Sequence, residues 1–136
     1  MIGILPITMK ELKPKETFFK KENYYIAKLP ITDGNETTLL SLDQILYIEA
    51  NGAYSCIVQK SDKRSTHGKN LLFFEQQLPT HSFLRVHKSY IINVIHIQSI
   101  IREKHWHIKL ISGQLIPVSD DKKSPLLNML GLQLAD

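Results

Sequence analysis

The spacing of turn residues constrains this chain more than any other feature of its sequence. From Tyr24 onward, short apolar runs are interrupted by polar turn signals about every 8–12 residues, which is typical of antiparallel β-structure. We therefore predict an all-β or β-rich domain. The predicted strands cover residues 24–29, 37–40, 46–50, 54–59, 64–67, 83–86, 106–111 and 115–118. The first two should form a hairpin with a long loop that contains Pro30 and Asp33-Gly34-Asn35.

Two segments change from strand to helix periodicity. In residues 70–78, Asn70 can cap the first turn, Pro79 blocks continuation, and one face carries Leu71, Phe74 and Leu78. In the second segment, Ser124 stands at the N-cap position before Pro125, and the apolar face is formed by Leu126, Leu127, Leu130 and Leu134. Both helices are expected to pack on the sheets.

The N-terminal part differs in composition from the rest of the chain. Between Lys10 and Glu22 there are five lysines and three glutamates around Pro14, which is typical of a solvated segment. We interpret residues 1–22 as a linker or N-terminal extension and residues 23–136 as one domain. The apolar run at residues 2–7 is too short to span a membrane, so we expect neither a signal peptide nor a membrane anchor.

The residue types that catalysis and metal binding need do not occur in suitable patterns. Cys56 is the only cysteine, so no intramolecular disulfide can form, and no cysteine and histidine spacing matches a zinc site. No glycine-rich phosphate loop or serine elbow is present. We expect a cytoplasmic protein that is not an enzyme and has no cofactor, metal or small-molecule substrate. The net charge of +4 is compatible with a polyanionic partner.

Three polar segments interrupt the predicted strands and are candidates for binding: residues 51–55, 85–89 and 119–123. In the second, Arg85 and Lys88 can neutralise phosphates, while His87 and Ser89 can donate to phosphate oxygens or base edges. A purely structural role for His87 is an equal alternative. For Ser89 and Asn93, hydrogen bonds to nearby backbone are the favoured interpretation.

Further polar and aromatic residues have simpler interpretations. A basic cluster of four residues is either a solvated face or a source of phosphate contacts, and it comprises Lys60, Lys63, Arg64 and Lys69. His105 and His107 flank Trp106 at strand spacing, but no third metal ligand lies nearby in the sequence. Trp106, Ile108 and Leu110 are most simply a core face.

Four segments in order resemble the LytTR family of DNA-binding domains. Residues 83–93, FLRVHKSYIIN, are similar to its signature of phenylalanine, arginine, histidine, a basic residue, serine, an aromatic residue and asparagine. Residues 45–50 with Tyr54 resemble its first strand pair, residues 70–78 its short helix, and residues 113–119 its closing strand. The resemblance covers the chain from about Tyr24 to Lys123.

The resemblance implies a mostly β fold of compact antiparallel β-sheets with one or two short helices. In that fold, loops at one edge enter successive major grooves of double-stranded DNA. Family members are mostly output domains of bacterial response regulators in two-component systems, and they bind direct repeats, which implies a homodimer on DNA. By position, the implied groove-facing residues are Ser55, with Asn51 beside it, and Lys88. The segment after Ser119 supplies the third contact.

This third segment departs from the family pattern. Arginine is usual directly after the serine, where this chain has Asp120 and Asp121. Either Lys122 and Lys123 replace the arginine, an aspartate accepts from a cytosine amino group, or the loop lies away from the DNA. We favour contacts of the two lysines with the DNA backbone.

Two other functions remain open from the sequence. One is a β-barrel module for single-stranded nucleic acid, for which Tyr54 and Tyr47 are the candidate stacking residues. The other is a protein-interaction module of a sensory system. In either a DNA-binding or a sensory role, the chain is too short to hold a receiver domain as well, so we expect a stand-alone regulator or one separated from an N-terminal partner domain.

Overall fold

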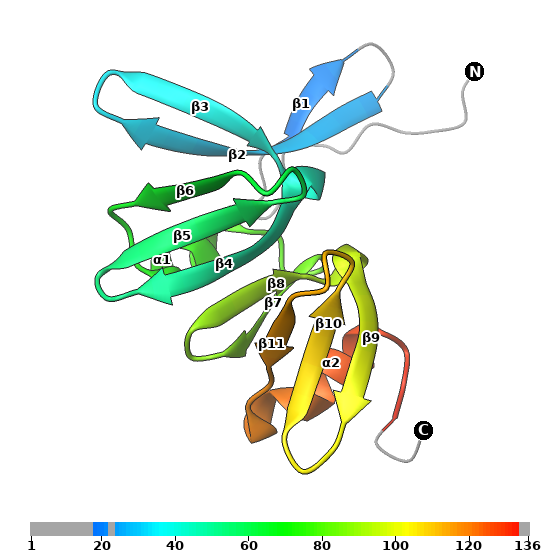
Figure 1. Cartoon of the computed structure of the whole chain (residues 1–136). Coiled ribbons are helices and arrows are strands. Elements are labelled where there is room, and N and C mark those ends of the chain that lie inside the picture. Colours follow the sequence, from blue (N-terminus) through cyan, green and yellow to red (C-terminus); the bar gives the residue numbers. More distant parts are fainter. Residues whose placement is uncertain (1–17, 22–23, 134–136) are drawn as a thin grey trace, which may run out of the picture.

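A computed structural model describes residues 18–21 and 24–133 and confirms the mostly β fold (Figure 1). Within that part of the chain the strands are β1 Phe18–Lys21, β2 Tyr24–Asp33, β3 Glu36–Ser41, β4 Ile45–Asn51, β5 Tyr54–Gln59, β6 Arg64–His67, β7 Phe83–His87, β8 Tyr90–Asn93, β9 Ile97–Arg102, β10 Trp106–Leu110 and β11 Leu115–Pro117. The α-helices are α1 Leu71–Gln77 and α2 Lys123–Met129, and the 3-10 turns are η1 Leu42–Gln44, η2 Val94–His96 and η3 Asp120–Lys122.

The strands form three antiparallel sheets that follow one another along the molecule (Figure 1). The first has the order β1-β2-β3, the central sheet β6-β5-β4-β8-β7, and the third β11-β10-β9. Each of the three described sheets is open at its edges, which does not fit the alternative of a β-barrel module.

Two hydrophobic cores occupy the two faces of the central sheet. Successive residues of a strand point to opposite faces, so Ile91 enters the core beneath α1 while Ile92 enters the core shared with β10 and α2. In β5, Ile57 likewise enters the first of these cores and Val58 the second. Burial of each such side chain contributes about 1.5–3 kcal/mol, so both cores hold the central sheet in place.

The first hairpin differs from the prediction in its loop. Strand β2 continues through Pro30, which pairs with Leu39, and the turn contains only Gly34 and Asn35. Pro30 is tolerated because β1 pairs with residues 24–27 alone, which leaves the other side of β2 unpaired at this point. Gly34 adopts a φ of +62°, the left-handed conformation that such tight turns require.

The predicted cap and buried face of helix α1 are both confirmed. The Phe73 amide donates to the Asn70 side chain at 3.0 Å, and Leu71, Phe74 and Leu78 are buried. Helix α2 begins at Lys123 and not after a Ser124 cap, because η3 runs directly into it. The predicted contribution of Leu134 lies outside the described residues.

Three strands were absent from the sequence prediction. Residues 18–21 of the expected linker form β1, and residues 90–93 and 97–102 form β8 and β9. Strand β9 lacks a clear apolar alternation, so only its pairing with β10 identifies it. None of the helices in the described residues is long and apolar enough to cross a membrane.

Candidate nucleic-acid interface

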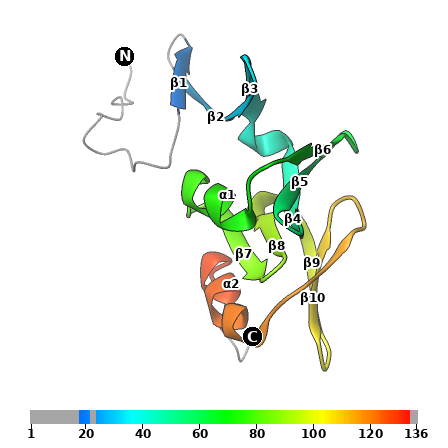
Figure 2. The same ribbon diagram turned by 90° about the vertical axis from the view of Figure 1, so that its left-hand side faces the viewer.

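The three polar segments singled out in the sequence lie side by side along one edge of the molecule. The Ala50 amide donates to the Ser89 carbonyl at 2.8 Å, which joins the β4–β5 hairpin to the β7–β8 turn. The Ser119 amide donates to the Val86 carbonyl at 2.8 Å, which joins β7 to η3. We call residues 51–54, 87–89 and 119–122 the loop edge; it lies at the lower left of Figure 1 and faces the viewer in Figure 2.

Asn51 and Ser55 of the first segment have opposite environments. Asn51 is exposed at the end of β4, and Tyr54 opposite it is 56% exposed. Ser55 is 0% exposed because it points to the same face of β5 as Ile57, which packs in the core beneath α1. No part of the Ser55 side chain is therefore open to a DNA groove, and we leave this residue out of the interface.

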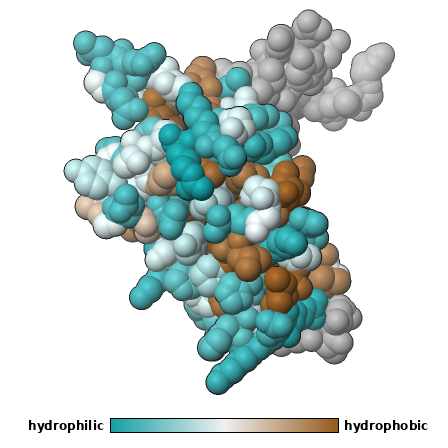
Figure 3. All heavy atoms as spheres, viewed as in Figure 1, coloured by the Kyte–Doolittle hydropathy of each residue, from teal (hydrophilic) through white to brown (hydrophobic). Residues whose placement is uncertain are grey.

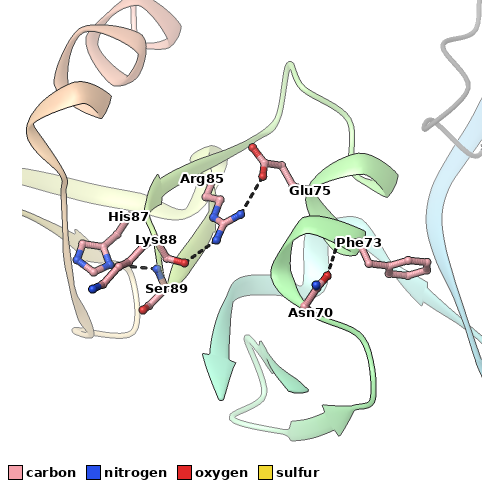
Figure 4. A network of polar contacts seen from close by, with 7 residues as sticks. All are labelled: Asn70, Phe73, Glu75, Arg85, His87, Lys88 and Ser89. Carbon is pink, nitrogen blue, oxygen red and sulfur yellow. Dashed lines mark hydrogen bonds and ion pairs between the residues drawn. The ribbon is translucent and has the colours of Figure 1, made fainter. Parts of the chain in front are cut away.

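Arg85 makes its contacts within the protein (Figure 4). Its guanidinium forms an ion pair with Glu75 of α1 at 3.1 Å and donates to the Lys88 carbonyl at 2.6 Å. The side chain is only 25% exposed. Arg85 thus connects helix α1 to the β7–β8 turn, which is a different arrangement from the free phosphate contact expected from the sequence.

Lys88 projects from a turn that is held on both sides. Its carbonyl accepts from Arg85, the following Ser89 amide donates to Nδ1 of His87 at 3.1 Å, and the Ser89 carbonyl accepts from Ala50. The Lys88 side chain itself is exposed. An ordered backbone with a free cationic side chain is a favourable arrangement for contact with DNA, because the turn has little entropy left to lose.

His87 and Asn93 both hydrogen-bond to nearby backbone. Because Nδ1 of His87 accepts the Ser89 amide, the neutral ring carries its proton on Nε2, which remains a donor. Asn93 is 2% exposed and donates to the carbonyls of Leu42 at 3.1 Å and Ile45 at 3.0 Å. Its Oδ1 also accepts the Ile95 amide at 3.3 Å, so the interpretation of Asn93 as a residue that bonds to nearby backbone is confirmed.

The two lysines after Ser119 differ in their surroundings. Lys123 pairs with Asp120 at 3.0 Å, and its Nζ lies 4.9 Å from the centroid of the Trp106 ring. Lys122 instead lines a shallow hollow of about 320 Å³ together with Glu75, Arg85, His87, Lys88, Ser119 and Asp121. Residues of the second and third segments therefore share one hollow, in which three cationic side chains face two carboxylates.

The predicted basic cluster is divided between the two ends of the central sheet. Lys60 and Lys63 lie in the β5–β6 turn, and Arg64 begins β6, at the end of β5 that is opposite to Tyr54. Arg64 hydrogen-bonds to Tyr47, and burial raises the pKa of the Tyr47 hydroxyl. Of the four, only Lys69 lies near the loop edge, because it follows Gly68, which packs beside the Tyr54 ring.

Glu49 and Tyr90 form a polar contact behind the loop edge. The Tyr90 hydroxyl donates to Oε2 of Glu49 at 3.1 Å. Burial, and then the nearby Glu49 carboxylate, raise the pKa of Tyr90. At neutral pH the hydroxyl therefore stays protonated and keeps donating to the carboxylate, which leaves this Glu49 oxygen paired.

Sequence reasoning missed two residues that shape this edge. Glu75 is ten residues from Arg85, and nothing in the local pattern pairs them. Trp106 was assigned to the core, but Lys123 and Arg102 also lie against its ring. In the part of the chain that the structure describes, no group of three or more His, Cys, Asp or Glu side chains is placed to hold a metal ion.

Comparisons with known proteins identify DNA-binding domains and transcription regulators as similar to this chain. The family model of the LytTr DNA-binding domain matches residues 35–131. The CO-responsive transcriptional regulator RcoM of Rhodospirillum rubrum is 27% identical over 111 residues, which are 79% of this chain and 47% of that protein. The sensory transduction protein LytR of Staphylococcus saprophyticus is 31% identical over 78 residues, 57% of this chain and 29% of that protein. The chain therefore spans less than half the length of either relative.

A solved structure has a fold similar to that of this chain. A LytTr DNA-binding domain from Bacillus cereus superimposes with a TM-score of 0.65 and 26% sequence identity. The match covers 77% of this chain and 97% of that domain.

Proposed function

The chain belongs to the LytTR family of DNA-binding domains, and on that basis we propose that it binds double-stranded DNA sequence-specifically as part of a bacterial transcription regulator. In this proposal the loop edge enters successive major grooves, and the protein acts in the cytoplasm, without catalysis. A homodimer on direct repeats and a role as the output domain of a response regulator belong to the same proposal.

One observation carries the proposal: the exposed Lys88 projects from a turn that is tied to both neighbouring loops. Backbone hydrogen bonds of 2.8 Å join Ala50 to Ser89 and Val86 to Ser119, so the three loops are held in register with one another. A duplex can meet all three without reordering them. Groove contacts by fixed loops need such preorganisation, because ordering each loop on binding would reduce the affinity.

The contacts of each side chain suggest its role on DNA. Lys88 is the candidate for a base edge, and Asn51 and Lys122 flank it. The Nε2 proton of His87 and the hydroxyl of Ser119 can donate to phosphate oxygens. Two other residues act through the protein: Arg85 positions the Lys88 turn, and Lys123 holds η3 against Trp106.

Selection of bound sequences from a random duplex pool tests this function. We expect enrichment of a repeated motif, and we expect the enriched duplex to bind much more tightly than a random duplex. Equal binding of single-stranded and double-stranded oligonucleotides, or no enrichment with the folded protein, would contradict the proposal.

A substitution at Lys88 tests the assignment of the interface. Lys88→Ala should lower affinity for the enriched duplex by about 1–3 kcal/mol if Lys88 contacts a base, and it should reduce the preference over a random duplex. The matched control is Lys60→Ala, which removes the same charge at the opposite end of the central sheet. An unchanged preference in Lys88→Ala would remove this residue from the base-reading set.

A further inference from the structure

The β9–β10 turn, residues 103–105, lies at the same end of the third sheet as η3. Arg102 pairs with Trp106, and His107 pairs with Pro117, so the turn and the exit of β11 share one end of the sheet. The Val118 amide donates to the Trp106 carbonyl at 3.0 Å, directly before η3 begins. Figure 1 shows the turn at the same end of the molecule as η3.

Trp106 connects this turn to η3 through its side chain. The Arg102 guanidinium carbon lies 5.4 Å from the centroid of the Trp106 ring, and Lys123 lies 4.9 Å from the same centroid. Lys123 in turn pairs with Asp120 of η3 at 3.0 Å. Arg102 and Lys123 thus contact the same ring, which connects the β9–β10 turn to the third loop of the interface.

The turn exposes basic side chains at the tip of the molecule. Arg102, Glu103, Lys104 and His105 are all exposed, and Figure 3 shows hydrophilic residues covering this tip. Two of the four are permanently cationic and one is anionic. Because the turn protrudes beyond η3, its cations are well placed to reach a duplex that already contacts η3.

The opposite end of the loop edge has the reverse charge. The β2–β3 turn carries Asp33 and Glu36, and Asp33 lies 3.6 Å from His67, which pairs with Ser55 beside the first loop. Carboxylates near phosphates are repulsive, whereas the cations of the β9–β10 turn are attracted to them. A duplex on the loop edge should therefore extend toward the β9–β10 turn and not toward the β2–β3 turn.

We propose that the β9–β10 turn is a fourth DNA-contacting segment, in which Arg102 and Lys104 bind phosphates beyond the groove that η3 faces. This inference rests on the proposed function, because it places a duplex on the loop edge. Such contacts carry no base information; they add affinity and fix how far the DNA extends along the protein.

The test measures the salt dependence of binding to two probes, the duplex enriched by selection and a random-sequence duplex. For the whole chain carrying Arg102→Gln and Lys104→Gln, the slope of log affinity against log salt should become shallower by about 2, close to 0.9 per lost phosphate contact. Affinity for both probes should fall by the same factor, so that the preference is unchanged. The matched control carries Lys60→Gln and Lys63→Gln and should keep the wild-type slope.

The outcomes separate this inference from the proposed function. If the wild-type chain binds the enriched duplex but the double variant keeps the wild-type slope, the fourth contact is wrong and the function stands. If the wild-type chain binds no duplex, both proposals fail. Lys104→Gln alone provides a second measurement, since Lys104 lies in the turn beyond β9, and this variant should change the slope by about 1.

Discussion

Glu75 of helix α1 and Arg85 of strand β7 form an ion pair at 3.1 Å, and the same guanidinium donates to the Lys88 carbonyl at 2.6 Å. Helix α1 is thereby connected to the turn that carries the exposed Lys88 (Figure 4). Charge-assisted hydrogen bonds of this kind are stronger and more directional than neutral ones. We therefore expect Glu75 to act on the proposed DNA binding through Arg85, without touching the DNA.

Replacing Glu75 by glutamine distinguishes a simple charge effect from a positioning role, because the two change DNA affinity in opposite directions. Removing a negative charge near a DNA-binding surface should, by electrostatics alone, tighten binding. Because Glu75 positions Arg85, we expect Glu75→Gln instead to weaken binding to the enriched duplex by about 1 kcal/mol, while binding to a random duplex stays equal or improves. Fluorescence anisotropy with both duplexes measures the difference. Glu36→Gln, in the β2–β3 turn, is the control, and uniformly tighter binding by Glu75→Gln would contradict the positioning role.

Asp121→Asn distinguishes two roles for the carboxylates that follow Ser119. If Lys122 contacts phosphates and Asp121 only opposes it, the variant should bind enriched and random duplexes more tightly by a similar factor. If Asp121 accepts from a cytosine amino group, the variant should lose preference at one position of the motif. We expect the first result, and repeating the sequence selection with the variant would reveal the second.

Asn93→Ala should destabilise the fold without a direct effect on the DNA surface. The Asn93 side chain donates to two backbone carbonyls and accepts the Ile95 amide at 3.3 Å, all in a buried position. Leaving buried polar groups unpaired costs about 1–3 kcal/mol, so the free energy of unfolding should fall by that order in a urea titration. Asn128→Ala, at an exposed position on α2, should have little effect, and equal losses in the two variants would argue against the role of Asn93.

Tyr47 and Tyr90 predict a loss of stability at alkaline pH. The pKa values of Tyr47 and Tyr90 are raised in the folded protein, mainly by burial. A raised pKa means that the folded state holds the proton more tightly than the unfolded state. Their contribution is therefore present below the unfolded pKa of about 10 and is lost as pH rises through the folded pKa.

Urea titrations at a series of alkaline pH values should accordingly show the free energy of unfolding falling above a pH of about 10. The fall should be shallower in Tyr90→Phe, which keeps the ring but has no hydroxyl to ionise. A Tyr90→Phe variant with the full wild-type slope would show that Tyr90 does not contribute.

Much of the fold could be predicted from the sequence because its signals are local. The Asn70 cap and Pro79 after α1 each act within a few residues, and the structure confirms them. Strand β4 itself is also confirmed, but its predicted half-buried alternation is wrong, because Leu46 and Ile48 are both buried and lie in different cores. Strand β9 and the continuation of β2 through Pro30 could not be predicted, because both depend on which neighbouring strand is present or absent. The start of α2 could not be predicted either, because η3 continues directly into the helix and moves its first residue to Lys123.

The candidate site shows the same division. Local patterns along the chain identify three polar segments between strands, with Lys88 as the central cation of the second. The burial of Ser55, the contacts of Arg85 with Glu75 and the Lys88 carbonyl, and the contacts of Lys123 with Asp120 and Trp106 emerge only in the folded molecule. They are not visible in the sequence because burial and pairing depend on which elements pack together. A side chain's residue type and local period say what it can contact, whereas the packing of α1, η3 and β10 against the sheets selects the partner it has.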